Sequence, residues 1–161
     1  MACDKQVGKT VEEFDAWIRT ADRPPSFGRN SLHALAACMG LVVATSRTEP
    51  DPEVTKADLH CAALDTNVLA GRVMGFTDTD IVETTNGIGL TLKMTGKVYG
   101  PGESDSNEWT VVGEPSLNLV NTELPTHLTT CATLVNRLPD VIAALPGYLT
   151  PHMLLRLTYR P

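Results

Sequence analysis

The sequence predicts an α+β domain with a mainly antiparallel sheet. Two helical patterns come first, several strand-like segments fill the middle of the chain, and a long helix follows near the end. Helices and strands that are segregated along a chain are typical of α+β folds, whereas parallel α/β folds alternate them. The chain has 161 residues and no internal repeat or linker, so residues 1–161 are expected to form a single domain.

The first helix begins with a capping box, in which Thr10 is the N-cap and Glu13 follows three residues later. The apolar residues after it fall on one helical face: Val11, Phe14, Trp17, Ile18 and Ala21. This helix is expected to end near residues 22–23, before the two prolines at 24 and 25.

A second helix is expected from about Asn30–Ser31, with Gly40 at its C′ position. Its alanines allow close packing against a neighbour. Its apolar side carries Leu32, Leu35, Ala36 and Met39.

Strand patterns occupy the middle of the chain. We expect a strand at residues 41–48, a proline-bearing loop at 49–53 and a further strand around 68–76. Residues 90–95 alternate between apolar and polar side chains, which is typical of a half-buried strand. Residues 100–107 are expected to form a surface loop, and 109–112 with 116–120 a strand region bent at 113–115.

The long helix is expected over residues 125–145. Its apolar stripe consists of Leu128, Cys131, Val135, Leu138, Ile142 and Leu145. Thr129, Thr133, Asn136 and Asp140 lie on roughly the opposite side, and we expect Arg137 and Asp140 to face water. Pro139 should kink the helix, and residues 155–159 could form a last strand.

Composition argues against several classes of partner. The net charge is −6 and the pI about 5.1, which disfavours nucleic acid and anionic membranes. No apolar run approaches the ~20 residues of a membrane span, and residues 1–10 do not read as a signal peptide, so a cytoplasmic location is expected. The four cysteines are expected to be reduced and buried, with Cys38 and Cys131 inside apolar patterns. No spacing of histidines and cysteines supports a metal site.

Motifs for nucleotide binding are also missing from the sequence. The segment VGKT at 7–10 ends like a phosphate-binding loop, but Cys3 stands where that loop needs a glycine. There is no G-x-G-x-x-G, no G-x-S-x-G and no H-E-x-x-H. We therefore expect the chain to bind no cofactor by itself.

The long helix carries a family resemblance. CATLVNRLPDVIAALPGYLT resembles the closing segment of the diaminopentanoate dehydrogenase-like family, relatives of dihydrodipicolinate reductase. The matching positions are Asn136, Pro139, Val141, Ala144, Pro146, Gly147 and Thr150. VGKTVEEFDAW, SLHALAACMGL, LAGRVMGF and EWTVVGEPSL are similar to other segments of the same family, so the resemblance spans nearly the whole chain.

The resemblance implies a fold for this chain and the absence of the family's nicotinamide-binding domain from these residues. Members of this family are about twice as long and begin with a nicotinamide-binding Rossmann domain; this chain corresponds to the second, substrate-binding and oligomerising domain. That domain is an open mixed sheet with helices on one face, and its other face meets neighbouring subunits. The resemblance therefore implies a homodimer or tetramer formed through the sheet. Residues 24–28 depart from the family, which often has a Gly-His-(Ile/Val)-Gly run there.

Candidate site residues cluster at the start of the second helix. Arg29, Asn30 and Ser31 could bind an anion at the helix N-terminus, with Ser26 nearby, although Asn30 or Ser31 could simply cap the helix. His33 or Glu83 is the candidate proton shuttle and Arg29 the anion clamp, although a boundary histidine is more often structural. Asn136 could line a pocket or brace the kink at Pro139, and Met74 could line an apolar pocket or the core.

Three functions are consistent with these observations. The first is a stand-alone enzyme for a small molecule, such as a cyclase, isomerase or lyase of biosynthesis, that works without nicotinamide. The second is the substrate subunit of a split NAD(P)H-dependent dehydrogenase or reductase, with a separate Rossmann subunit as partner. The third is a non-catalytic binding module.

Overall fold

The structure is a computed structural model that describes residues 5–21 and 26–154. It divides into two compact units, Met1–Gly100 and Pro101–Pro161, and each is described by itself. The prediction that residues 1–161 act as one domain stays a prediction.

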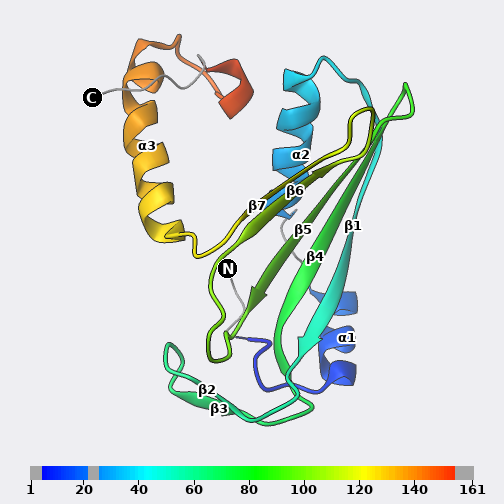
Figure 1. Cartoon of the computed structure of the whole chain (residues 1–161), viewed down its shortest axis with the longest axis vertical. Coiled ribbons are helices and arrows are strands. Elements are labelled where there is room, and N and C mark those ends of the chain that lie inside the picture. Colours follow the sequence, from blue (N-terminus) through cyan, green and yellow to red (C-terminus); the bar gives the residue numbers. More distant parts are fainter. Residues whose placement is uncertain (1–4, 22–25, 155–161) are drawn as a thin grey trace. The chain divides into compact units, whose positions relative to one another are not determined.

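The first unit contains a three-stranded antiparallel sheet in the order β1-β4-β5 (Figure 1). Its strands are β1 (Val43–Val54), β4 (Val73–Thr84) and β5 (Gly89–Lys97). The expected loop at 49–53 is wrong, because β1 continues through Pro50 and Pro52. The prolines are tolerated because, among the described strands, β1 pairs only with β4 and is an edge strand, where an absent N–H breaks no ladder on the outer side.

A small hairpin connects β1 to β4. It consists of β2 (Leu59–Cys61) and β3 (Thr66–Val68), which form a two-stranded antiparallel sheet with each other. The single strand expected around 68–76 is therefore interrupted. The interruption is a turn in which Gly71 has φ 82 and donates its N–H to the Thr55 carbonyl at 2.8 Å. Glycine adopts that left-handed conformation without the steric cost of a Cβ.

Helix α1 (Val11–Thr20) packs its apolar face on one end of the sheet. The expected capping box is present, with the Thr10 side chain bound by the Glu13 N–H and the Glu13 carboxylate bound by the Thr10 N–H. Phe14 is almost fully buried and forms the core of this unit with Val73 and Phe76. The ring centroids of Phe14 and Phe76 lie 5.8 Å apart, at a tilted angle that suits aromatic pairs.

Helix α2 (Phe27–Cys38) covers another part of the sheet, against β1, β4 and β5 (Figure 1). It begins before the expected Asn30–Ser31, and its N-cap is Ser26. Gly40 has φ 69 beyond the last turn, as its expected C′ role requires. Phe76 contacts α1 and Asp80 contacts α2, and both belong to the same alternating set on β4, so the two helices share one face.

The opposite face of the sheet is polar. It carries Arg47, Glu53, Thr77, Glu83 and Lys93, and the Thr77 hydroxyl donates to Glu53 at 2.6 Å. The α+β class and the helices on one face are confirmed. Every described strand pair is antiparallel, which agrees with the expected mainly antiparallel sheet.

The second unit contains a hairpin, a long helix and a short 3₁₀ turn. The hairpin is β6 (Asn107–Val111) and β7 (Leu117–Asn121), joined by a loop with a cis Glu114–Pro115 bond. Helix α3 is Thr126–Ala143 and η1 is Pro151–Met153. The strand expected at 155–159 lies outside the described residues.

Helix α3 exposes the side that was expected to be buried. Its apolar stripe is open to solvent, with Leu138 50% and Ile142 81% exposed. The side chains of Arg137 and Asp140, expected in water, are only 19% and 8% exposed and lie 3.4 Å apart. The expectation for this pair is therefore wrong, because both side chains are largely buried, although Thr129, Thr133 and Asn136 on the same side of the helix are exposed.

The described cysteines Cys38, Cys61 and Cys131 are free. Cys61 is buried, but Cys38 and Cys131 are exposed, so the expected burial of those two is wrong. Cys131 is exposed because it belongs to the outward stripe of α3. Within residues 5–21 and 26–154, no helix is long and apolar enough to cross a membrane.

Candidate functional site at the start of helix α2

Ser26 anchors the start of α2 to the sheet. As N-cap, its hydroxyl oxygen accepts the Gly28 N–H at 3.1 Å. The same hydroxyl donates its proton to the Asp80 carboxylate at 2.6 Å. Ser26 and Asp80 are both buried, so this bond is shielded from water and is stronger than an exposed one.

Asp80 is the centre of a buried polar cluster. It lies in the middle of β4 with no exposed surface, and the register places Thr48 of β1 beside it. The Thr48 hydroxyl donates to one carboxylate oxygen at 2.5 Å, and Ser26 donates to the other. The Nη2 atom of Arg29 donates to the Thr48 oxygen at 2.7 Å. Thr48 therefore connects the Arg29 guanidinium to the carboxylate, and the positive charge of Arg29 balances the buried carboxylate through this hydroxyl. Ser26, Arg29, Thr48 and Asp80 are called the Asp80 cluster below.

Gly28 permits the close approach of α2 to this cluster. A Cβ at position 28 would lie 2.2 Å from Asp80 Oδ2 and 2.8 Å from Leu92 Cδ2. Both contacts are below any real van der Waals separation. Only glycine therefore lets the first turn of α2 rest directly on the buried carboxylate.

Arg29 has one hydrogen-bond donor that is not used within the Asp80 cluster. Its side chain is half-buried, and its Nε–H is buried without a hydrogen-bond partner in the described structure. An unsatisfied buried donor is costly, so this N–H is well suited to an acceptor atom of a ligand. The arrangement can orient an anionic or carbonyl group through Arg29, whose position is fixed by Thr48 and Asp80.

The other residues predicted for this region point elsewhere. Asn30 and His33 are exposed on α2, and the Ser31 hydroxyl donates to the Phe27 carbonyl at 3.1 Å. Ser31 and Asn30 are not the N-cap, because Ser26 fills that position. The structure thus brings together Ser26 and Arg29 of the predicted set, and the roles of His33, Asn30 and Ser31 stay predictions.

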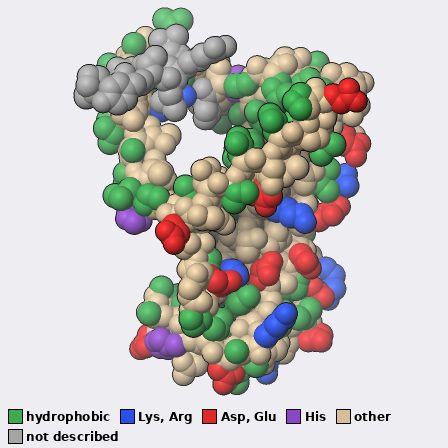
Figure 2. Space-filling model, in the orientation of Figure 1, with side chains coloured by type: hydrophobic (Ala, Val, Ile, Leu, Met, Phe, Trp, Pro, Cys, Tyr) green, Lys and Arg blue, Asp and Glu red, His purple; other side chains and the backbone are tan. Residues whose placement is uncertain are grey.

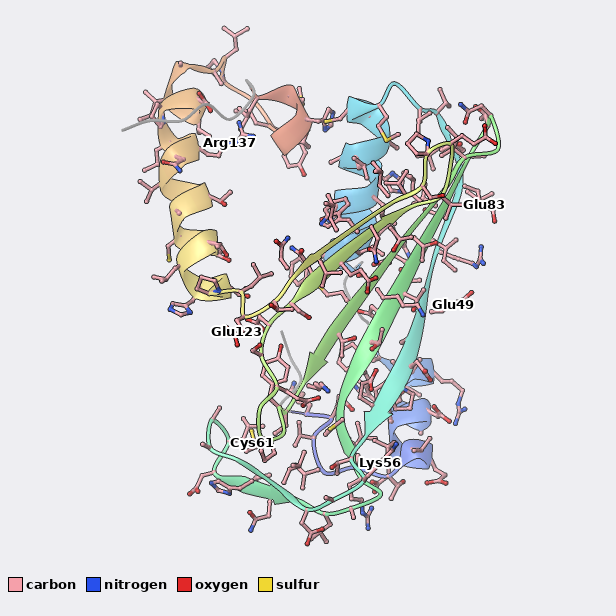
Figure 3. All side chains as sticks on the ribbon, viewed as in Figure 1. Glu49, Lys56, Cys61, Glu83, Glu123 and Arg137 are labelled. Carbon is pink, nitrogen blue, oxygen red and sulfur yellow. The ribbon has the colours of Figure 1, made fainter. Side chains whose placement is uncertain are left out.

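Glu83 lies on the opposite face of the sheet from the Asp80 cluster. The two residues are three positions apart on β4, and side chains alternate between faces along a strand. Glu83 is exposed and lies 3.6 Å from the Arg47 Nη1, while Arg47 Nε contacts Glu49 at 2.9 Å (Figure 3). The hydrogen bond to Glu49 raises the pKa of Arg47, and Glu83 adds to the shift. Exposed pairs of this kind contribute little to stability.

Met74 and Asn136 also lie apart from the cluster. Met74 is half-buried at the start of β4, where its carbonyl accepts the Val98 N–H at 2.8 Å. Asn136 is exposed on α3, in the second unit. Whether Asn136 contacts a ligand or braces the helix at Pro139 stays a prediction.

Sequence reasoning missed Asp80 and Thr48. Asp80 is one of two aspartates in the apolar segment VMGFTDTDIVET of β4, and a charged residue at an inward position of a strand needs a partner. That signal was available in the alternation of β4. Thr48 could not be found in the same way, because its role depends on the register between β1 and β4.

The described residues offer no metal site and no cradle for a dinucleotide. No group of three or more histidines, cysteines or acidic residues comes together within residues 5–21 and 26–154. A nicotinamide dinucleotide usually binds where a parallel strand meets a glycine-rich turn and a helix. Every described strand pair here is antiparallel, and the turn before α3 contains no glycine. The residues present therefore do not fit that cofactor.

Comparison with known proteins identifies the family. Residues 1–156 match the model of the 2,4-diaminopentanoate dehydrogenase C-terminal domain. The fold is similar to the structure of an amine dehydrogenase from Mycobacterium smegmatis, with a TM-score of 0.89 and 51% sequence identity. That match covers 98% of this chain and 47% of the other, so the chain spans about half the length of that protein. None of the curated proteins matches this chain. On these findings, the chain belongs to the 2,4-diaminopentanoate dehydrogenase C-terminal domain family.

Proposed function

We propose that this chain is the substrate-side part of an NAD(P)H-dependent dehydrogenase that acts on a small primary amine or amino acid. The observation that carries the proposal is the family match over residues 1–156, together with 51% identity to an amine dehydrogenase. The nicotinamide would be bound by a Rossmann module outside the 161 residues, because the described residues do not fit it.

The Asp80 cluster supplies a role for this part of the enzyme. Asp80 and Thr48 hold the Arg29 side chain in place, and the Arg29 Nε–H remains for a substrate acceptor. A carboxylate on the substrate would be the best acceptor, because a charge-assisted bond to a guanidinium is stronger than a neutral one. In this proposal Arg29 positions the substrate and His33 on the same helix is the candidate proton shuttle, whereas Glu83 lies on the opposite face of the sheet from Arg29.

The test uses the part of the Mycobacterium smegmatis amine dehydrogenase that precedes the matched segment. It is fused to the N-terminus of this chain, and amine-dependent reduction of NAD⁺ or NADP⁺ is followed at 340 nm. The substrates are a panel of primary amines and 2,4-diaminopentanoate. We expect activity from the fusion and none from either part alone. A fusion that binds nicotinamide but oxidises no amine would contradict the proposal.

Arg29 is tested within the same fusion. Arg29→Met should lower kcat/KM for a carboxylate-bearing amine by about 10- to 100-fold, as expected for a lost hydrogen bond to a charged group. The same variant should leave kcat/KM for an amine without a carboxylate nearly unchanged. Equal losses for both substrates would show that Arg29 is structural.

A cyclase or isomerase that works without nicotinamide stays a prediction that neither comparison supports. Both comparisons name dehydrogenases. Turnover of a substrate by the chain alone, without added nicotinamide, would favour that alternative.

A further inference from the structure

Strand β1 is a long edge strand whose outer side meets no other described strand. It spans 12 residues, and the sheet order places it beside β4 alone among the described strands (Figure 1). Most strands of globular proteins have roughly 3–10 residues. The unpaired N–H and C=O groups of an edge strand are a template for a further strand, and a long edge presents many of them. Such an edge needs a feature that keeps other strands away.

The backbone bonds of the sheet show which residues of β1 point outward. The Val98 N–H donates to the Met74 carbonyl at 2.8 Å, so Met74 turns its backbone groups toward β5. In an antiparallel sheet, successive residues of a strand turn these groups to opposite sides. The odd-numbered residues within 75–83 of β4 therefore face β1, and the β1 residues opposite them are also odd-numbered. The even-numbered residues within 46–52 of β1 consequently turn their backbone groups away from the sheet.

Two of these four outward positions are prolines. The outward row consists of Ser46, Thr48, Pro50 and Pro52, and proline has no N–H. A strand laid along this edge would find donors at Ser46 and Thr48 and none at positions 50 and 52. Its own carbonyls opposite the prolines would lose their hydrogen bonds to water without replacement, which costs free energy. Both prolines stand where they break no bond to β4, so they block the outer side alone.

Charged side chains act in the same direction. They alternate with the outward residues along β1 and are Arg47, Glu49, Asp51 and Glu53. Figure 2 shows acidic and basic side chains along the margin on which β1 lies in Figure 1. If two β1 strands paired antiparallel about Pro50, Glu49 of each copy would stand opposite Asp51 of the other. Like charges in opposite positions destabilise a strand pair.

We propose that Pro50 and Pro52, together with these charges, keep the outer edge of β1 closed to a second copy of this chain. The prolines remove the donors that a paired strand needs, and the acidic side chains repel their counterparts. The inference goes beyond the proposed function and does not depend on it.

The test compares self-association of the full chain and its variants by sedimentation equilibrium. Pro50→Val combined with Pro52→Val restores both outward donors. The measurement is made at about 1 M NaCl, where the Debye length is about 3 Å, so that repulsion between the acidic side chains is screened. We expect the double variant to self-associate at least tenfold more tightly than the unaltered chain, because each pair of copies gains hydrogen bonds at the restored positions. Asp51→Val is the matched control, since its backbone groups face β4, and it should leave self-association unchanged.

Amide hydrogen exchange shows whether the new contact lies on β1. In the dilute monomer, the new amides at positions 50 and 52 should exchange as fast as exposed amides, because they point to solvent. At concentrations where the double variant associates, these two amides and those of Ser46 and Thr48 should become protected. The single variants Pro50→Val and Pro52→Val should each show part of the effect, so the result does not depend on the fold of one variant. Circular dichroism checks that each variant is folded.

Three results would overturn the inference. Equal self-association of the unaltered chain, the double variant and both single variants would show that the prolines do not close the edge. An equal rise for Asp51→Val would show that association follows from a more apolar strand and not from restored donors. Protection of the new amides in the monomer would show that positions 50 and 52 do not face outward.

Discussion

At the scale of single residues, substitution of Asp80 should lower the free energy of unfolding substantially. The hydroxyls of Ser26 and Thr48 donate to its two oxygens, and Arg29 is connected to it through Thr48. Asp80→Asn replaces one acceptor oxygen with an NH₂ group and removes the charge that balances Arg29. We expect the free energy of unfolding to fall by about 2 kcal/mol, the cost of an unsatisfied buried hydrogen bond to a charged group. Urea denaturation measures the change.

The control for Asp80 is Asp51→Asn, because Asp51 is an exposed aspartate on the neighbouring strand β1. Surface substitutions of this kind usually change stability by less than about 0.5 kcal/mol. Equal effects at positions 51 and 80 would show that the cluster does not stabilise the fold.

Gly28 gives a second test at this scale. Gly28→Ala forces a Cβ to within 2.2 Å of Asp80 Oδ2, so either α2 or the carboxylate must move. We expect a loss of about 1–3 kcal/mol in unfolding free energy, as for other overpacked sites. Gly89→Ala is the matched control, since nothing lies within 4 Å of a Cβ there. A stable Gly28→Ala protein with an unchanged melting temperature would disprove the tight approach of α2.

Residue-level predictions from the sequence succeeded where the signal was local. The pair Thr10 and Glu13 forms a capping box because both bonds depend only on positions three residues apart. Arg29 and Ser26 were found because they stand at a helix start. Their partners Thr48 and Asp80 come from strands far along the chain, and no local pattern brings those four together.

At the scale of elements, the cap of α1 should control the stability of the first unit. Thr10 satisfies one of the free N–H groups at the start of α1, and Phe14 on that helix fills the core. Thr10→Ala should lower the free energy of unfolding by about 1 kcal/mol, because the Glu13 N–H loses its acceptor. Thr10→Ser keeps the hydroxyl and should retain most of that energy. Thermal denaturation monitored by far-UV circular dichroism distinguishes the two variants, and equal melting temperatures would argue against the cap.

Elements were predicted well in type and less well in extent. The three helices were expected from their periodicity, but β1 was cut short at Pro50 because proline is normally excluded from strands. Only the sheet order shows that β1 is an edge strand, where proline is tolerated. For α3 the periodicity found the apolar stripe but assigned it to the core. A hydrophobic pattern says which residues share a face, and it does not say whether that face meets the same chain or another body.

At the scale of the whole molecule, the two units differ in the number of apolar side chains that each one buries. The first unit buries Phe14, Val73, Phe76 and Val82, whereas no described apolar residue of the second unit is buried. A two-stranded hairpin without a covered face is marginally stable in water. Composition predicted one ordinary globular domain, because hydrophobic residues are 42% of the chain. Composition does not show which of these residues are buried.

The two tryptophans can report on the two units separately. Trp17 lies in the core region of the first unit, and Trp109 is 54% exposed on β6 in the second. Trp109→Phe leaves Trp17 as the fluorescent probe, and Trp17→Phe leaves Trp109. In a urea titration of the chain alone, we expect Trp17 to show a cooperative transition. Trp109 should change at a lower urea concentration, because its unit has little buried apolar area to lose.

Coincident transitions for the two probes would show that the chain unfolds as one cooperative domain, which would contradict this expectation. Phenylalanine at position 17 retains part of the core packing, so the comparison does not depend on an unfolded variant.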